Sequence, residues 1–183
     1  MSQEITINEV LVKVEAWDLE KTKRRLVTNE TWPERLCTEV DPIYRRLMTL
    51  KGFFPTEVLI PPITIDTFWH AHMLDSMVYA QDCQNAFGRF IHHIPFDPAE
   101  LTPELRSEVR ENRDKTLKLY VASFGELNPY SKSVWENPYP LKIDFAYMDR
   151  IGVGQKSNKN PSGTSSSQST TRGLNNFGPP ACR

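Results

Sequence analysis

The sequence predicts a mostly α-helical protein: a compact helical bundle with a central buried helix, a short extended His-His segment and a coil-rich C-terminal wrap. Apolar residues recur every three or four positions in several segments between residues 9 and 124, which is the period of an α-helix. Helix start and stop residues frame these segments, as at Thr102-Pro103-Glu104 and at Gly125. A hydrophobic fraction of 39% with 25% charged residues is ordinary for a globular protein, so fibrous and wholly disordered classes are excluded.

The length of 183 residues suits one domain with a single hydrophobic core. We expect a helical domain over residues 1–150 and a disordered tail rich in Gly, Ser, Thr and Asn over residues 151–183. The tail holds five of the eight glycines and one aromatic residue, Phe177, so it cannot bury enough apolar surface to offset its ordering entropy. Its last ten residues are a candidate recognition peptide through which an unknown protein partner could bind.

Charge and hydropathy argue against two classes of partner. Residues 151–183 contain four basic and no acidic side chains, so residues 1–150 carry a net negative charge, which disfavours nucleic-acid binding. No run of 18 apolar residues occurs, and the N-terminus lacks the features of a secretory signal. We therefore expect no membrane span and a cytoplasmic location, where the three cysteines stay reduced.

The first half of the chain predicts two long helical segments. Apolar residues recur at helical spacing over residues 9–29. Thr31 to Glu34 read as a capping box that begins a second helix, which Pro42 should kink or divide and Gly52 should end. We expect the basic run from Lys21 to Arg25 and the pair Arg45-Arg46 to be solvent-exposed helix faces.

The second half predicts the central helix of the bundle. Residues 64–85 form one helical pattern whose two faces both carry apolar side chains, so we expect it to be covered on both sides. Residues 89–95 are extended by composition, and a helix capped by Thr102 follows and stops at Gly125. Residues 126–150 are rich in Pro, Tyr and Trp and should pack on the bundle as ordered coil.

All four histidines lie in this region, and helical geometry divides them. His70 and His72 are two residues apart, about 200 degrees on a helix, so only one of them can serve a given site. His92 and His93 point to opposite sides of an extended segment, so again at most one faces the helix. The histidines therefore form two alternating pairs.

Two metal sites can be assembled from these pairs and their neighbours. One would combine His72, Cys83 and either His92 or His93, a mixture of imidazole and thiolate that zinc accepts. The other would combine His70, Asp66 and the remaining member of the 92/93 pair in a harder nitrogen-and-oxygen site. Zinc or iron is the expected ion.

The region also carries a longer motif. The motif runs through Ile65-Asp-Thr-Phe-Trp69-His-Ala-His72-Met-Leu-Asp75, Tyr79-Ala-Gln-Asp-Cys83, Phe87-Gly88 and Phe90-Ile-His92-His93-Ile-Pro95. Through these residues the sequence resembles the glycine-rich domain-containing protein-like family, which has members in plants, fungi and bacteria. The likeness is strongest over residues 60–98. The resemblance implies a helical domain and brings no established catalytic residues, and the modest glycine count of the tail departs from the longer plant members.

Two functions fit these observations. The first is metal-assisted hydrolysis or oxidation at the His/Asp/Cys cluster, with Asp66 or Asp75 as a base beside the metal. The second is a non-enzymatic protein-interaction module in which the histidine motif is hydrogen-bonded core.

Overall fold

The computed structural model describes residues 5–95 and 102–136, and within these ranges it contains seven helices and no strand. The predicted mostly α-helical fold class is confirmed. The helices follow one another as α1 (Ile7–Glu15), α2 (Glu20–Asn29), α3 (Glu34–Phe53), α4 (Ile63–Met73), α5 (Ser76–Phe87), α6 (Pro103–Phe124) and α7 (Pro129–Glu136).

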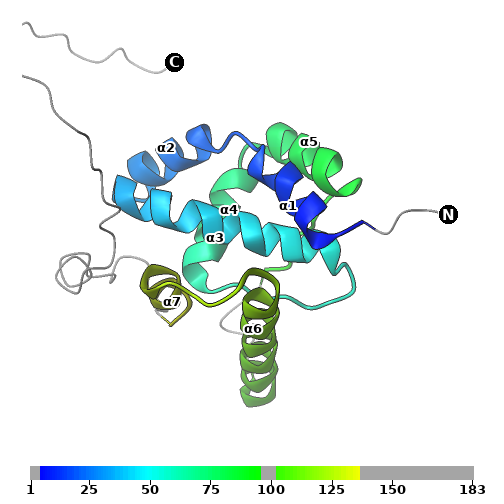
Figure 1. Ribbon diagram of the computed structural model, residues 1–183. Helices are drawn as coiled ribbons and strands as arrows, with labels where there is room; N and C mark the ends of the chain where they lie inside the picture. Colours follow the sequence, from blue (N-terminus) through cyan, green and yellow to red (C-terminus); the bar gives the residue numbers. More distant parts are fainter. Residues whose placement is uncertain (1–4, 96–101, 137–183) are drawn as a thin grey trace, which may run out of the picture.

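Helix α3 is the centre of the bundle (Figure 1) and contacts each of the other six helices. Our prediction that residues 64–85 supply the central helix was wrong in this respect. Four consecutive α3 residues, Leu47 to Leu50, are fully buried, which requires neighbours on every side of the helix. Segments on both flanks of α3 in the sequence supply those neighbours.

The beginning of α3 differs from the predicted capping box. Thr31 adopts a φ of 55°, and the helix begins at Glu34 with Pro33 in the cap position and no side-chain cap. Trp32 is buried, and its backbone N–H donates to Leu26 O at 3.1 Å, which ties this turn to α2. A capping box does occur at α1, where Thr6 and Glu9 exchange hydrogen bonds.

Two predicted helix breakers lie inside α3. The helix continues through Pro42, and Val40 and Ile43 on either side of it are buried, so packing outweighs the loss of one backbone hydrogen bond. Gly52 does not end the helix, which runs one residue further. A Cβ atom at Gly52 would lie 2.2 Å from Cδ1 of Phe87, so this glycine permits the close approach of α5.

The predicted helix over residues 64–85 is broken into α4 and α5. The break falls at Leu74 and Asp75, and Asp75 forms an ion pair with Lys21 of α2. No Gly or Pro marks this turn, and the only local signal for it is Asp75, a residue type that favours the helix N-cap position that it takes in α5. The turn folds α5 back so that Tyr79 meets His72 of α4, with ring centroids 5.1 Å apart.

The segment 9–29 also forms two helices, α1 and α2. Trp17 and Leu19 lie in the connection and are buried, which explains why the apolar pattern continues across it. Trp17 packs in the core against Tyr44, His72 and Phe87.

Two basic side chains predicted to face solvent bind helix ends instead. The Arg45 guanidinium donates to the carbonyls of Val14 and Trp17 at 2.7 and 3.0 Å, at the C-terminal end of α1. Arg25 donates to Ala71 O of α4 at 2.7 Å. Carbonyls at helix ends lack intrahelical partners, so these arginines join neighbouring helices through backbone groups.

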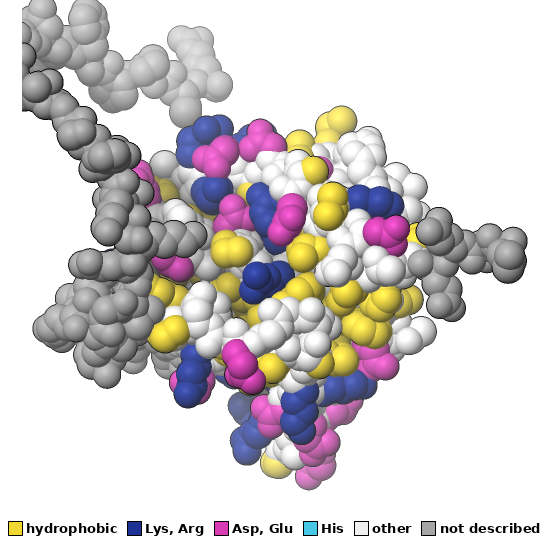
Figure 2. All heavy atoms as spheres, in the orientation of Figure 1, with side chains coloured by type: hydrophobic (Ala, Val, Ile, Leu, Met, Phe, Trp, Pro, Cys, Tyr) yellow, Lys and Arg dark blue, Asp and Glu magenta, His cyan; other side chains and the backbone are white. Residues whose placement is uncertain are grey.

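Helix α6 begins with the predicted Thr102 cap, whose hydroxyl accepts from Leu105 N–H, and ends at Gly125 with a φ of 84°. It projects from the body of the bundle (Figure 1), and its surface carries both signs of charge (Figure 2). Residues 129–136, predicted as coil, form helix α7, because Tyr130, Val134 and Trp135 recur at helical spacing and are buried.

Residues 137–150 and the tail predicted for residues 151–183 lie outside the described residues. Throughout 5–95 and 102–136, no helix is both long enough and apolar enough to cross a lipid bilayer.

Candidate metal site

Helix α4 places Asp66 and His70 on one face, because residues four apart are neighbours on a helix. Nε2 of His70 lies 3.5 Å from Oδ2 of Asp66. The imidazole of His70 is half exposed, with 51% of its side-chain surface accessible, while His72 of the same helix is 1% exposed. The predicted division of this histidine pair is confirmed.

The extended segment after α5 brings a third side chain to the same place. Ile91 is buried and Ile94 is exposed, and His92 and His93 alternate between them as the two-residue period of an extended chain requires. His93 points toward α4 and keeps 13% of its side-chain surface exposed, while His92 is exposed and packs at a tilted angle against the Phe90 ring.

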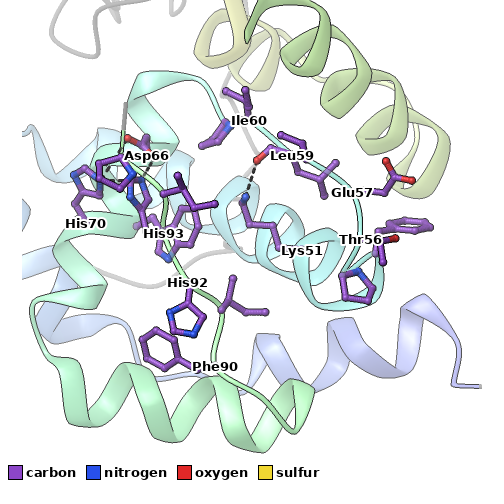
Figure 3. Close-up of a pocket in the computed structure, with 18 of the residues that line it drawn as sticks. Lys51, Thr56, Glu57, Leu59, Ile60, Asp66, His70, Phe90, His92 and His93 are labelled. Carbon is purple, nitrogen blue, oxygen red and sulfur yellow. Dashed lines mark hydrogen bonds and ion pairs between the residues drawn. The ribbon is translucent and has the colours of Figure 1, made fainter. Parts of the chain in front are cut away.

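Three ligand-type atoms converge where these elements meet (Figure 3). Nε2 of His93 lies 3.0 Å from Oδ1 of Asp66 and 3.0 Å from Nε2 of His70. Neighbouring ligand atoms at metal–ligand bonds of about 2.1 Å are about 3.0 Å apart in octahedral sites and about 3.4 Å apart in tetrahedral ones. Asp66, His70 and His93, hereafter the Asp/His group, are the one such cluster of His, Cys, Asp or Glu in the described part of the chain.

Hydrogen bonding by itself does not explain this convergence well. A ring nitrogen carries at most one hydrogen, yet Nε2 of His93 has two partners at 3.0 Å, Asp66 and His70. One hydrogen can point along only one of these two lines. A cation among the three atoms would instead accept the lone pairs of all of them.

A buried hydrogen-bond chain holds the group in place. Nε1 of Trp69 donates to the Tyr79 hydroxyl at 2.9 Å, and that hydroxyl donates to Ile91 O at 2.7 Å. The chain links α4, α5 and the extended segment, and the indole of Trp69 packs edge-on against the His93 ring at 4.8 Å. Tyr79 thereby sets the distance between the helix that carries His70 and the segment that carries His93.

The Asp/His group borders a cavity of about 690 Å³ (Figure 3). Its walls come from the end of α3, the connection from α3 to α4, one face of α4, the extended segment and Val109 of α6. The lining is largely apolar, and Lys51 and Arg89 add positive charge. This volume and character are typical of small-molecule sites.

Lys51 is a residue of the cavity that the sequence analysis missed. Its Nζ donates to Leu59 O at 2.6 Å and lies 4.7 Å from the centroid of the Trp69 ring. Burial lowers the pKa of its ammonium group from 10.5 to about 8, although the charge of Asp66 acts in the opposite direction. Its position in the last turn of a helix resembles that of many solvent-exposed lysines, so the sequence held no signal for this environment.

His72 belongs to a separate buried network. Its Nδ1 shares a hydrogen bond of 2.8 Å with the Tyr44 hydroxyl, and its Nε2 shares one of 3.1 Å with Oδ2 of Asp82. Burial is also the main cause that raises the pKa of the Tyr44 hydroxyl, which keeps it neutral. Both ring nitrogens of His72 therefore have protein partners.

The other residues of the first predicted metal site lie apart from the Asp/His group. Cys83 is fully buried, and burial raises the pKa of its thiol, which disfavours the thiolate that a metal needs. His92 lines the cavity next to His93 but points to the other side of the extended segment. Asp75, predicted as a base, lies at the turn between α4 and α5 in its ion pair with Lys21.

Comparisons of this chain with protein-family models, with curated proteins and with solved structures found no match.

Proposed function

We propose that Asp66, His70 and His93 bind a divalent transition metal, zinc or iron, and that this metal assists chemistry on a small molecule held in the adjacent cavity. The observation that carries the proposal is the convergence of two imidazole nitrogens and one carboxylate, with contacts of 3.0, 3.0 and 3.5 Å, at the border of an apolar cavity. Two histidines and one carboxylate suit both ions, as a catalytic zinc site or as a facial iron site.

Three protein ligands favour a catalytic site over a structural one. Structural zinc is held by four side chains, while catalytic sites keep at least one position for water or substrate. The bound metal would supply an activated water or polarise a substrate oxygen, which corresponds to metal-assisted hydrolysis or oxidation. The Asp66 carboxylate would then serve as a ligand rather than as the separate base first predicted.

The alternative function, in which the histidine motif is structural core, fits His72. His72 lies in the interior with Tyr44 and Asp82 as partners and has no access to the cavity lining. The resemblance to the glycine-rich domain-containing protein-like family stays a prediction. If it holds, we expect its members to share this split between a core histidine and a surface histidine.

Elemental analysis of protein purified without a metal-affinity column tests the proposal. We expect about one equivalent of zinc or iron per chain in the native protein, or after reconstitution with Zn²⁺ or, without oxygen, Fe²⁺. Asp66→Asn, His70→Ala and His93→Ala should each lower the metal affinity by tenfold or more.

His92→Ala is the matched control, because it removes an imidazole that lines the same cavity but does not belong to the Asp/His group. It should retain the metal of the wild type. The proposal would be wrong if the three ligand variants kept as much metal as His92→Ala. It would also be wrong if the wild type held no metal either as purified or after reconstitution. Far-UV circular dichroism confirms that each variant keeps its helices.

A further inference from the structure

The cavity beside the Asp/His group has an uneven charge distribution. Among its acidic residues, Asp66 lies within the group and Glu57 is paired with Lys115 of α6. Its two basic residues are Lys51 and Arg89, and Arg89 donates to the backbone carbonyls at the end of α3. Positive charge is therefore left without an acidic partner in this part of the described protein.

Lys51 is the cation that a ligand can reach. An ammonium group has three N–H donors, and only one hydrogen bond engages them, with Leu59 O. Across residues 5–95 and 102–136, no carboxylate lies within ion-pair distance of Lys51. Figure 3 shows its side chain between the Asp/His group and the connection that precedes α4.

Most of the remaining lining is apolar, and several of its side chains are exposed. Val58, Ile63, Phe90 and Ile94 are between 40% and 77% accessible although they border a concave surface. Exposed apolar side chains gathered around a cavity are typical of a site for an apolar ligand.

We propose that the cavity binds a small amphipathic carboxylate, with its carboxylate on the Lys51 ammonium and its apolar body along Val58, Ile63, Phe90 and Ile94. A carboxylate carries one negative charge and two acceptor oxygens, which matches one ammonium group with free donors. A phosphate dianion would favour a second cation, and Arg89, the other basic residue of the lining, directs its Nη2 to the backbone carbonyls at the end of α3. The inference rests on the proposed function in one respect: the carboxylate ligand would lie in the cavity beside the metal bound by the Asp/His group.

Isothermal titration calorimetry of the full-length protein at pH 7 with octanoate, octan-1-ol and octyl phosphate tests this inference. Octanoate should bind about 10- to 100-fold more tightly than octanol, because a hydrogen-bonded ion pair in an apolar site adds that much affinity. Octyl phosphate should bind more weakly than octanoate. Lys51→Met and Lys51→Gln should each remove the advantage of octanoate and leave octanol binding within threefold of the wild type.

Lys118→Met is the matched control, since it removes an exposed lysine of α6 that lies outside the cavity lining. It should leave octanoate affinity unchanged. Equal affinity for octanoate and octanol, tighter binding of octyl phosphate, or octanoate binding unaffected by both Lys51 variants would each overturn the inference.

A titration of Asp66→Asn in the presence of a chelator separates the two proposals. Octanoate binding that persists without metal and still requires Lys51 supports the inference even if the metal site fails. Octanoate binding that requires metal and not Lys51 would place the carboxylate on the metal and overturn it.

Discussion

The Nε2 atoms of His70 and His93 lie 3.0 Å apart, although 23 residues separate the two histidines in the sequence. Helix α4 carries one of them and the extended segment after α5 carries the other. His72 and His92 each point to the opposite side from their neighbour. The side chains of His70 and His93 therefore converge, while those of His72 and His92 lie outside the Asp/His group. This division leads to the predictions below.

Zinc titration should perturb only the converging pair. In long-range ¹H–¹⁵N spectra of the imidazoles, we expect Nε2 of His70 and His93 to shift on addition of Zn²⁺. The nitrogens of His72 should stay unchanged because Tyr44 and Asp82 occupy both of them. A zinc-dependent shift at His72 would contradict the assignment of the site.

Tyr79→Phe should weaken metal binding without removing a ligand. The substitution deletes the hydroxyl that accepts from Trp69 and donates to Ile91 O, so the segment that carries His93 loses this hydrogen-bonded link to α4. Loss of such supporting bonds typically lowers metal affinity by about 10- to 100-fold. Competition with a chromophoric chelator measures the metal affinity. An unchanged affinity would show that the hydrogen bonds from Trp69 through Tyr79 to Ile91 do not position His93.

His72→Ala should destabilise the fold rather than the metal site. It leaves the Tyr44 hydroxyl and the Asp82 carboxylate without their imidazole partner and opens a space in the core. We expect a loss of about 2–4 kcal/mol in the free energy of unfolding. Urea denaturation measures this loss, and metal affinity at low urea should stay within threefold of the wild type.

Gly52→Ala should also destabilise the protein, through overpacking. A Cβ atom there would lie 2.2 Å from the Phe87 ring, so α5 must move away from α3. The expected cost is about 1–3 kcal/mol. In Phe87→Leu the flat ring is gone, so the same glycine substitution should cost less, and a double-mutant cycle from urea denaturation measures the difference.

Lys51→Met should change how stability depends on pH. Below pH 8 the Lys51 ammonium is charged in both the folded and the unfolded protein, and the folded protein bears the cost of its burial. Because its pKa falls from 10.5 to about 8 on folding, the wild type loses this cost as pH rises between these values. Relative to Lys51→Met, the wild type should therefore gain about 2 kcal/mol between about pH 7 and pH 9.5. Denaturation of both proteins at these two pH values measures the difference, and parallel pH profiles would contradict it.

The sequence contained enough information for the fold class and for the grouping of the histidines. Helical periodicity and the alternation of an extended chain depend only on backbone geometry, so they correctly separated His70 from His72 and His92 from His93. The cap at Thr102 and the stop at Gly125 were predictable for the same local reason. The second predicted metal site, with Asp66 and His70, is the one whose side chains come together.

Packing decided what local patterns could not. The turn at Asp75 contains no Gly or Pro and is held by an ion pair with a residue 54 positions away, so it was predicted as continuous helix. Pro42 was predicted to interrupt a helix that buried neighbours keep intact. Arg25 and Arg45 looked like solvated charges until distant helix ends supplied carbonyl partners.

Sequence alone therefore determined that this protein is helical and that at most one histidine of each pair can serve a given site, because both properties follow from the backbone period. Only the tertiary structure decided which histidines meet, which helix is central and that Lys51 lies in a cavity. These properties depend on contacts between segments far apart in the chain, where burial and close packing outweigh local preference. The four crowded histidines are accordingly one core residue, one outward-facing neighbour and the pair of imidazoles in the Asp/His group.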